Sequence, residues 1–299
     1  MAFTAALDIG GTTLVGGLVR RDGTVHRRLE APAPRAAADV VDASIALLEQ
    51  LIGSDVVDAI GIGSPGTIHP IEGIVTASDS KPEYAGARIG PEIGEHLDLP
   101  YAVTNDVNAA AVGELARGIA QGFSRALVVS VGTGVGGALL LNGRIEEGMH
   151  GTAGEIAHLL VGTRGVHPCG CGRRDHLEAV ASGPAIEARS AAVGGPATLP
   201  ELARRVAAGE RAATEILDEA ATWLGRAVAG LANALDIDAL ILTGGVVRIG
   251  PPYTDRVGAA FTAEVMRPLR EVPVLVGALG ADAPLIGAAT YVRARLGID

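Results

Sequence analysis

The chain has 299 residues, with 34 acidic and 24 basic side chains that give a formal net charge of −10. This acidic balance argues against a nucleic-acid-binding protein, which needs a basic face to neutralise phosphates. Hydrophobic residues make up 48% of the chain and charged residues 19%, which is typical of a well-packed soluble protein with one large or two medium domains.

Two further features of the composition limit the function. No apolar run approaches the roughly 20 residues that span a bilayer, and the N-terminus lacks the basic-then-apolar pattern of a signal peptide, so we expect a cytoplasmic protein with no membrane partner. Lys81 is the only lysine and follows no glycine, which excludes a phosphate loop of the form G-x-x-x-x-G-K-[ST]. Backbone amides and a metal would therefore have to bind any nucleotide.

The first part of the chain reads as a β-meander followed by alternating helices and strands. Apolar strands are predicted at residues 5–9 and 13–19 around the turn Gly10-Gly11, and Asp22-Gly23 opens a third strand. Helical spacing of apolar residues then predicts a helix over 40–51. The remaining predictions for this part are a strand at 59–62 that ends in the turn 63–66, a strand at 101–104 and an Ala-rich helix at 107–119.

The second part begins by repeating the opening pattern. A strand at 125–131 enters the turn Gly132-Thr133-Gly134, and a returning strand at 138–141 is closed by Asn142-Gly143. Superposing Ile9 on Val131 relates the two units, and internal duplication is the simplest explanation.

The remainder of the chain alternates again between strands and helices. Residues 150–174 have no clear period and predict an ordered loop. They are followed by a long helix at 211–235, a strand at 239–242 that enters Thr243-Gly244-Gly245, a helix, a strand at 274–276 and a final helix from Pro284. This alternation predicts an α/β fold.

Glycines 132, 134 and 137 satisfy the dinucleotide-binding pattern G-x-G-x-x-G, but the context does not fit it. That pattern needs a helix after the glycines, and here a strand and an Asn-Gly hairpin follow. The exposed backbone N–H groups of such turns can still converge on phosphate oxygens. Either turn alone is best explained as a tight hairpin. Two of them, with Asp8 just before the first, favour phosphate binding.

Asn105 and Asp106 stand at the end of a predicted strand and the start of a predicted helix. Both residue types are preferred helix caps, so capping alone explains them. A carboxylate at the carboxyl end of an α/β strand also lies where ligands usually bind, and it can accept a hydroxyl proton during phosphoryl transfer. The sequence leaves both interpretations open.

A loop rich in cysteine and histidine offers a metal site. Cys169, Cys171, His158 and His176 have spacings that can close a tetrahedron, and zinc accepts two thiolates and two imidazoles. His150 and His167 are alternative imidazoles, and the two cysteines can also be read as small hydrophobic residues. Glu155 and Glu178 flank this loop, either as ligands for hydroxyl groups or as solvated acids.

Taken in order along the chain, these motifs resemble the ROK family of bacterial sugar kinases. The resemblance covers nearly the whole chain and rests on the following segments: Leu7-Asp8-Ile9-Gly10-Gly11-Thr12, Gly61-Ile62-Gly63-Ser64-Pro65-Gly66, Asn105-Asp106-Val107-Asn108, Gly132-Thr133-Gly134-Val135-Gly136-Gly137, Gly154-Glu155 with His158, Cys169-Gly170-Cys171-Gly172, and Thr243-Gly244-Gly245. Each motif is weak alone, and their ordered combination is specific.

The resemblance implies an actin-like (ribonuclease H-like) ATPase fold of two lobes with a central cleft. The N-terminal lobe would span 1–117 and be completed by the C-terminal helix 284–299. The C-terminal lobe would span 118–283 and include a zinc loop at 154–178. ATP and Mg²⁺ would be the cofactors, Zn²⁺ would be structural, and the protein would form a homodimer.

The resemblance also implies roles for individual residues. Asp106 is the expected catalytic base on the 6-hydroxyl of the sugar. The expected sugar-binding residues are Gly66, Asn105, Asp106, Glu155, His158 and Glu178. The phosphates and their Mg²⁺ would be bound by Asp8, Gly10, Gly11, Thr12, Thr13, Gly132, Thr133 and Gly134, and the adenosine by Gly244 and Gly245. The zinc ligands would be His158, Cys169, Cys171 and His176.

Three departures from the family pattern concern the site. The family's zinc loop usually reads C-x-C-G-x-x-G-C-x-E, and this chain has Asp175-His176 where Gly-Cys is expected, so that an imidazole replaces a thiolate. Ala157 replaces the glycine of the Glu-x-Gly-His pattern. The segment 76–84 lacks the family's usual Asn-Leu and Trp, and since that Asn normally touches the sugar, glucose specificity is an open question.

We therefore expect an ATP-dependent kinase that phosphorylates the 6-hydroxyl of a hexose or amino-hexose, with a glucose-like sugar favoured. The alternative is a non-catalytic sugar-binding or regulatory protein of the same family. Regulators of this family carry an N-terminal DNA-binding domain, and the first predicted strand already begins at Ala5. The sequence names neither the sugar nor the pathway, and it leaves open whether polyphosphate can replace ATP.

Overall fold

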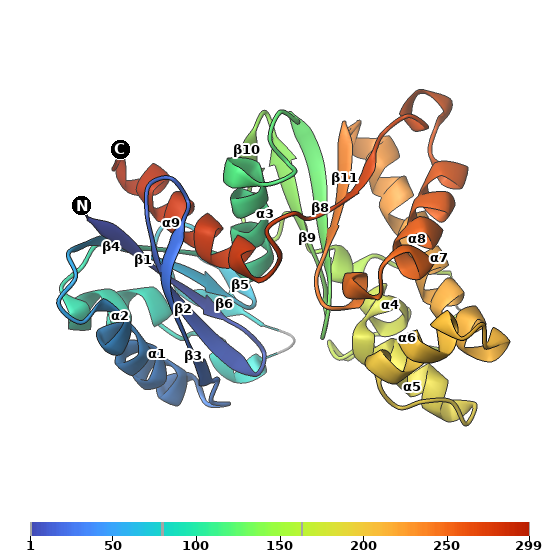
Figure 1. Ribbon diagram of the computed structural model, residues 1–299, viewed down its shortest axis with the longest axis horizontal. Coiled ribbons are helices and arrows are strands. Elements are labelled where there is room, and N and C mark those ends of the chain that lie inside the picture. Colours follow the sequence, from blue (N-terminus) through green and yellow to red (C-terminus); the bar gives the residue numbers. More distant parts are fainter. Residues whose placement is uncertain (1, 79–80, 163, 299) are drawn as a thin grey trace. The chain divides into compact units, whose positions relative to one another are not determined.

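The structure is a computed structural model that describes residues 2–78, 81–162 and 164–298. The chain forms two compact units, whose elements are labelled in Figure 1. The first unit comprises Met1–Gly122, Gly143–Ala153 and Ala278–Asp299, and the second comprises Phe123–Asn142 and Gly154–Gly277. The chain therefore passes from one unit to the other four times.

The first unit is built on a mixed sheet with the strand order β3-β2-β1-β4-β7. Its strands are β1 (Phe3–Ile9), β2 (Thr13–Val19), β3 (Val25–Pro32), β4 (Val57–Ser64) and β7 (Tyr101–Asn105). The first three form the predicted antiparallel meander, and β4 and β7 extend it in parallel with β1. A separate pair, β5 (Thr67–Ile68) and β6 (Val75–Ala77), is antiparallel. The sequence did not predict this pair.

Helices cover both faces of this sheet. Since successive side chains of a strand point to opposite faces, each strand contributes to two cores. Along β1, Leu7 and Ile9 pack in a core with α1 (Ala37–Ile52) and α2 (Ile89–Leu97). Ala6 belongs to a smaller core with α3 (Asp106–Arg117) and α9 (Ala283–Leu296). Burial on both faces explains why β1 and β4 are nearly continuous apolar runs.

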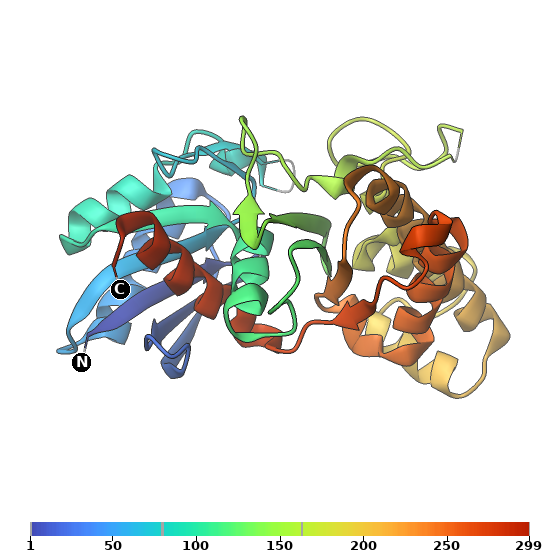
Figure 2. The ribbon, with the colours of Figure 1, turned by 90° about the horizontal axis from the view of Figure 1, so that it is seen from above.

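The C-terminal helix α9 packs side by side with α3, as Figure 1 and Figure 2 show. Glycines allow this close approach. A Cβ atom added to Gly287 would lie 1.6 Å from the carbonyl oxygen of Ala109, and one added to Gly61 on β4 would lie 2.0 Å from that of Ala288. Both obstacles are backbone atoms, which cannot rotate away.

Replacing Gly287 with Ala should therefore destabilise the protein strongly, by about 3 kcal/mol or more, since overpacking against backbone forces α9 away from α3. Gly230 in α7 (Arg211–Leu235) is the matched control, because nothing lies within 4 Å of a Cβ atom there. We expect Gly230→Ala to be neutral or stabilising by up to about 1 kcal/mol. Urea unfolding of both variants measures this, and equal stabilities would contradict the packing described here.

The second unit has a sheet with the strands β9 (Val135–Leu141), β8 (Arg125–Val131), β11 (Ala239–Thr243) and β12 (Val274–Val276) side by side in this order. β8 and β9 are antiparallel, and β11 and β12 run parallel to β8. The short strand β10 (Arg144–Glu146) follows β9 along the chain and belongs to the first unit. A hairpin followed by parallel strands thus recurs in both units, which supports internal duplication.

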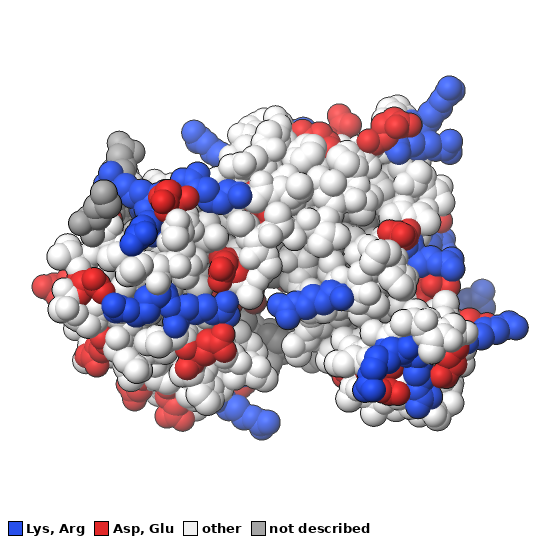
Figure 3. Space-filling view, viewed as in Figure 1, with Lys and Arg blue, Asp and Glu red and all other residues white. Residues whose placement is uncertain are grey.

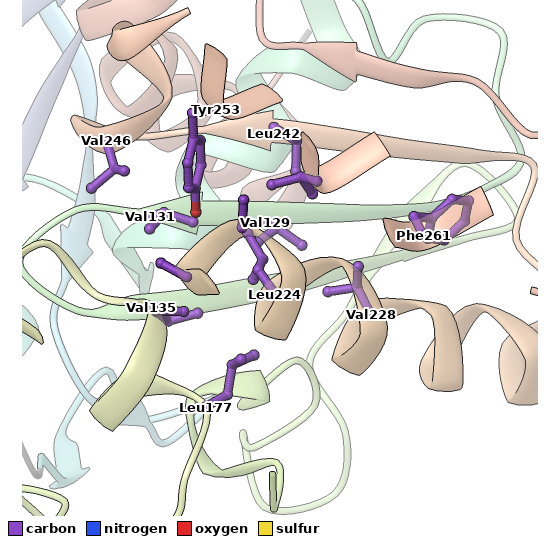
Figure 4. Packing of buried hydrophobic residues seen from close by; sticks show 14 of the residues in the cluster. Val129, Val131, Val135, Leu177, Leu224, Val228, Leu242, Val246, Tyr253 and Phe261 are labelled. Carbon is purple, nitrogen blue, oxygen red and sulfur yellow. The ribbon is translucent and has the colours of Figure 1, made fainter. Parts of the chain in front are cut away.

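The core of the second unit lies between its sheet and its longest helices. Figure 4 shows Val129 of β8 and Leu224 of α7 in this core, with Tyr253 and Phe261 contributed by α8 (Pro251–Glu264). Three shorter helices complete the unit: α4 (Glu178–Ala181), α5 (Gly183–Ala192) and α6 (Leu199–Ala207).

Most predicted elements are present, with shifts at their ends. The helix expected at 107–119 is α3, which begins at Asp106 and ends at Arg117 because Gly118 leaves the helical conformation. In the described part of the loop expected at 150–174, the regular elements are the 3₁₀ turn η2 (Ile156–His158) and the isolated β-bridges Leu160–His176 and Pro168–Arg174. Further 3₁₀ turns are η1 (Pro82–Tyr84), η3 (Val246–Ile249), η4 (Arg267–Leu269) and η5 (Gly280–Asp282).

None of the helices in the described part of the chain is long and apolar enough to cross a bilayer. On the face shown in Figure 3, basic and acidic side chains are interspersed. Arg28 pairs with both Glu30 (2.8 Å) and Asp282 (3.1 Å).

Candidate active site and metal centre

The parallel strands of the first unit bring two carboxylates together. Asp8 near the end of β1 is paired in register with Gly63 on β4, and Ser64 is paired with Asn105, the last residue of β7. A Cβ atom on Gly63 would lie 3.5 Å from Asp8 Oδ1 and 3.5 Å from the Cα atom of Asp106. Asp8 and Asp106 therefore flank Gly63 at the carboxyl ends of three adjacent strands, which is where α/β folds usually bind ligands.

Burial raises the pKa of both carboxylates. Burial, and then the neighbouring Asp106, raise the pKa of Asp8 to about 7, against the opposing effect of Arg28. Burial also raises the pKa of Asp106, although the Val107 N–H, which donates to its Oδ1 (2.9 Å), favours the charged form. A site with this surplus of negative charge and oxygen donors fits a hard divalent cation such as Mg²⁺.

Asn105 caps α3 and also holds the neighbouring turn. Its Oδ1 accepts hydrogen bonds from the N–H groups of Val107 (2.8 Å) and Asn108 (3.2 Å), so the capping interpretation is confirmed. Its Nδ2 donates to the carbonyl oxygen of Gly66 (3.1 Å). Gly66 has φ +95°, and a Cβ atom there would lie 2.4 Å from the carbonyl oxygen of Ala77, so only glycine fits. Gly66, Asn105 and Asp106 thus lie together.

The first glycine turn joins β1 to β2 directly after Asp8. The Gly10 N–H donates to the carbonyl oxygen of Thr13 (2.9 Å), which makes the turn tight. Gly11 and Thr12 are exposed at its tip, and the hydroxyl groups of Thr12 and Thr13 are 3.5 Å apart. The predicted phosphate ligands of this turn are therefore accessible and adjacent to the carboxylate pair.

The second glycine turn lies in the second unit, together with the predicted adenosine residues. The Gly132 N–H donates to the carbonyl oxygen of Gly134 (2.9 Å), and Thr133 is exposed at the tip. A Cβ atom on Gly244 would lie 2.4 Å from the carbonyl oxygen of Val131, and one on Gly132 would lie 3.9 Å from the backbone nitrogen of Gly245. The end of β11 and the β8–β9 turn are therefore in direct contact.

The predicted metal ligands also lie together in the second unit. One ligand atom from each of His158, Cys169, Cys171 and His176 lies within 4.8 Å of the others. His176 Nδ1 is 3.2 Å from both His158 Nδ1 and Cys171 Sγ. The edges of a tetrahedral zinc site with two nitrogen and two sulfur ligands are about 3.3–3.8 Å long, from zinc–ligand distances of about 2.0–2.3 Å. The donor set and its spacing therefore fit zinc, and they include neither His150 nor His167.

Asp175 is a structural residue of this loop that the sequence interpretation missed. It has φ +60°, a left-handed conformation that Asp tolerates better than most residues, and it stands where the family pattern has glycine. Its carboxylate accepts hydrogen bonds from the N–H groups of Gly165 and His167, the latter at 2.9 Å. Asp175 therefore takes a conformation that glycine adopts readily, and its carboxylate ties the loop to Gly165 and His167.

The two remaining predicted sugar ligands, Glu155 and Glu178, lie at the two ends of this loop. Glu155 directly precedes η2 and Glu178 is the first residue of α4, both in the second unit. In the divergent segment 76–84, Asp79 and Ser80 lie outside the described residues. Tyr84 is buried, and its hydroxyl donates to the carbonyl oxygen of Pro34 (3.1 Å), so it is a core residue.

The substitution Asp8→Asn should change how stability depends on pH. Because the pKa of Asp8 rises from 3.8 to about 7 on folding, the folded protein keeps a proton that the unfolded chain has lost between about pH 4 and 7. The wild-type protein therefore loses stability as the pH rises through this window, and the neutral Asn does not. In thermal unfolding without Mg²⁺, the Tm of Asp8→Asn minus that of wild type should grow from about pH 5 to about pH 8. A constant difference would contradict the assigned pKa.

Comparisons with known proteins agree with these motifs. A glucokinase from Halalkalibacterium halodurans is 31% identical, over 96% of this chain and 94% of its own. An N-acetylmannosamine kinase from Yersinia pseudotuberculosis is 33% identical, over 97% of this chain and 98% of its own. The crystal structure of a ROK family glucokinase from Streptomyces griseus, in complex with glucose and AMPPNP, matches with a TM-score of 0.86 at 28% identity and covers 98% of this chain and 100% of that one.

The match to a family model identifies the family of this chain. The ROK family model covers residues 4–295, which is nearly the whole sequence. The chain therefore belongs to the ROK family, with the actin-like ATPase fold of its sugar kinases.

Proposed function

We propose that the protein is an ATP-dependent kinase that phosphorylates the 6-hydroxyl of a hexose or amino-hexose, with a glucose-like sugar favoured. The main support is Asp106, a carboxylate of raised pKa that lies beside Asp8 at the carboxyl ends of parallel strands. Curated relatives that act on glucose or on N-acetylmannosamine support the same sugar-kinase chemistry.

Asp106 is the proposed catalytic base. It would accept the proton of the attacking hydroxyl as the bond to phosphorus forms, which orients the oxygen and prevents a build-up of positive charge on it. A raised pKa suits this task, because a base works best when its pKa approaches the working pH. The helix cap made by Asn105 fixes the backbone that carries Asp106, and we propose that the same Asn105 and Gly66 contact the sugar.

The phosphates would be bound by backbone amides of the two glycine turns and by the Thr hydroxyls at their tips. The proposed residues are Asp8, Gly10, Gly11, Thr12, Thr13, Gly132, Thr133 and Gly134, with Gly244 and Gly245 beside the adenosine. Mg²⁺, held by the Asp8 carboxylate, would neutralise charge on the phosphates when bound. The carboxylate pair fits this ion because protonating or coordinating Asp8 relieves its repulsion with Asp106.

The second unit would add Glu155, His158 and Glu178 as sugar ligands. His158 contributes its Nδ1 to the metal cluster, so a sugar hydroxyl would meet its Nε2. We infer that Zn²⁺ is structural here, because all four of its ligand positions are supplied by side chains. We also propose that the protein is cytoplasmic and forms a homodimer. Light scattering of the purified protein tests the dimer.

A panel of acceptors tests the proposed function. The protein is incubated with ATP, Mg²⁺ and one sugar at a time, namely glucose, mannose, glucosamine, N-acetylglucosamine, N-acetylmannosamine or a 3-amino sugar, and ADP release is followed. We expect sugar-dependent release with at least one of them. A protein that binds sugars but releases no ADP would be the non-catalytic alternative. Formation of the sugar phosphate with polyphosphate in place of ATP would identify a second donor.

A further inference from the structure

The glycine turn between β8 and β9 is held at both ends by the segment that begins at Glu178. At its start, the Gly183 N–H donates to the carbonyl oxygen of Gly132 (2.8 Å). At its end, the Val135 N–H donates to Glu178 Oε2 (3.1 Å). A Cβ atom on Gly134 would lie 2.6 Å from this Oε2, so the carboxylate rests directly against the turn.

Glu178 is itself fixed from the side of the metal cluster. The Ala179 N–H donates to the carbonyl oxygen of the predicted ligand His176 (3.0 Å), and the Val180 N–H donates to that of Leu177 (3.1 Å). Leu177 and Val180 are fully buried in the core of the second unit. The backbone of Glu178 is therefore held by the loop before it and by the core beneath it.

The two oxygens of Glu178 have different surroundings. Oε2 accepts the Val135 N–H, whereas Oε1 accepts no hydrogen bond from any residue in the described ranges. We propose that Glu178 is a positioning residue for the phosphate-binding turn, with Oε2 fixing the Val135 peptide and Oε1 left for a sugar hydroxyl. This inference rests on the proposed function, because it takes the Gly132–Gly134 turn as part of the ATP site.

Two opposite effects on nucleotide binding can be expected from this carboxylate. A negative charge beside a phosphate site repels the ligand, whereas a charge-assisted hydrogen bond to the turn aligns the backbone amides before the ligand arrives. The substitutions Glu178→Ala and Glu178→Gln separate them. Both remove the charge, but the amide oxygen of Gln can still accept the Val135 N–H.

The experiment is equilibrium binding of AMPPNP with Mg²⁺ in the absence of sugar, so that a lost sugar contact does not contribute. We expect Glu178→Ala to raise the Kd about tenfold, as for the loss of a hydrogen bond to a charged group, and Glu178→Gln to stay within about twofold of wild type. Glu178→Asp keeps the charge but shortens the side chain, so it should resemble Glu178→Ala. Glu178→Asp therefore also tests the inference if the Ala variant does not fold.

Asp238, which directly precedes β11, provides the matched control. Its carboxylate accepts the N–H groups of Ser124 (2.8 Å) and Arg125 (3.0 Å) at the opposite end of β8 from the turn. Asp238→Ala should leave the Kd of AMPPNP within about twofold of wild type, although it loses comparable hydrogen bonds.

The inference is overturned if Glu178→Ala binds AMPPNP as tightly as wild type or more tightly, or if Glu178→Gln binds AMPPNP as weakly as Glu178→Ala does. Failure of the wild-type protein to bind AMPPNP would instead contradict the proposed function, and the inference with it.

Discussion

Replacing Asp106 with Asn is expected to lower kcat by about 10²–10⁴ while the Kd of the sugar changes by no more than a few-fold. The substitution is nearly isosteric, and the amide oxygen of Asn can still accept the Val107 N–H that Asp106 Oδ1 accepts at 2.9 Å. The variant therefore keeps the start of α3 but has no basic group for the hydroxyl proton. General-base catalysis contributes a factor of this size. Steady-state kinetics with calorimetric sugar binding measures both quantities.

The control for this variant is Asp58, at the opposite end of the same sheet. Asp58 lies near the start of β4, and its Oδ1 accepts the hydroxyl of Thr4 (2.8 Å). Asp58→Asn removes one carboxylate from the first unit far from the strand ends that carry Asp8 and Asp106, so kcat should stay within about twofold of wild type. A kcat for Asp106→Asn close to that of wild type would exclude Asp106 as the base.

The second large effect is expected at the metal cluster. His176→Ala should lose the metal and lower the Tm by roughly 10 °C, because the ion would cross-link three separate segments of the loop, around His158, around Cys169 and Cys171, and at His176. His176→Cys restores the thiolate of the family pattern and should keep the metal. Elemental analysis of each purified protein gives the zinc content, and differential scanning calorimetry gives the Tm.

His167 is the control for the metal prediction. It lies in the same loop, and its backbone is held by Asp175, but it is not among the four clustered residues. His167→Ala should therefore keep one zinc per chain and nearly the wild-type Tm. Wild-type protein that contains no zinc after purification without chelators would show that the cluster is not a zinc site.

The sequence predicted the hairpins and the metal cluster because local signals define both. The glycine turns at 10–11 and 132–134 each lie between two apolar strands, and β2 and β8 have the predicted bounds. The four predicted metal ligands follow from residue type and spacing, and the structure brings their potential ligand atoms together. Tight turns and short ligand spacings involve neighbouring residues, so no knowledge of the tertiary fold is needed.

Other parts depend on contacts between distant segments, which no local pattern in the sequence specifies. Asp8 and Asp106 meet only because β4 pairs with both β1 and β7 in parallel, and no local pattern specifies that pairing. The contact of Glu178 with Val135 likewise requires the packing of α4 against the β8–β9 turn. The helices α5 and α6 begin at Gly-Pro and Leu-Pro steps that read locally as breaks, although proline in the first turn of a helix is well tolerated.

The central claim is that this chain transfers the γ-phosphoryl group of ATP to the 6-hydroxyl of a sugar. The most direct measurement is a phosphorus–proton correlation spectrum of the product made from ATP and the sugar with the highest kcat/KM. We predict a single phosphomonoester whose phosphorus couples to the two protons on C6. A phosphate on another carbon would contradict the assigned position, and ADP release without any phosphorylated sugar would contradict the kinase itself.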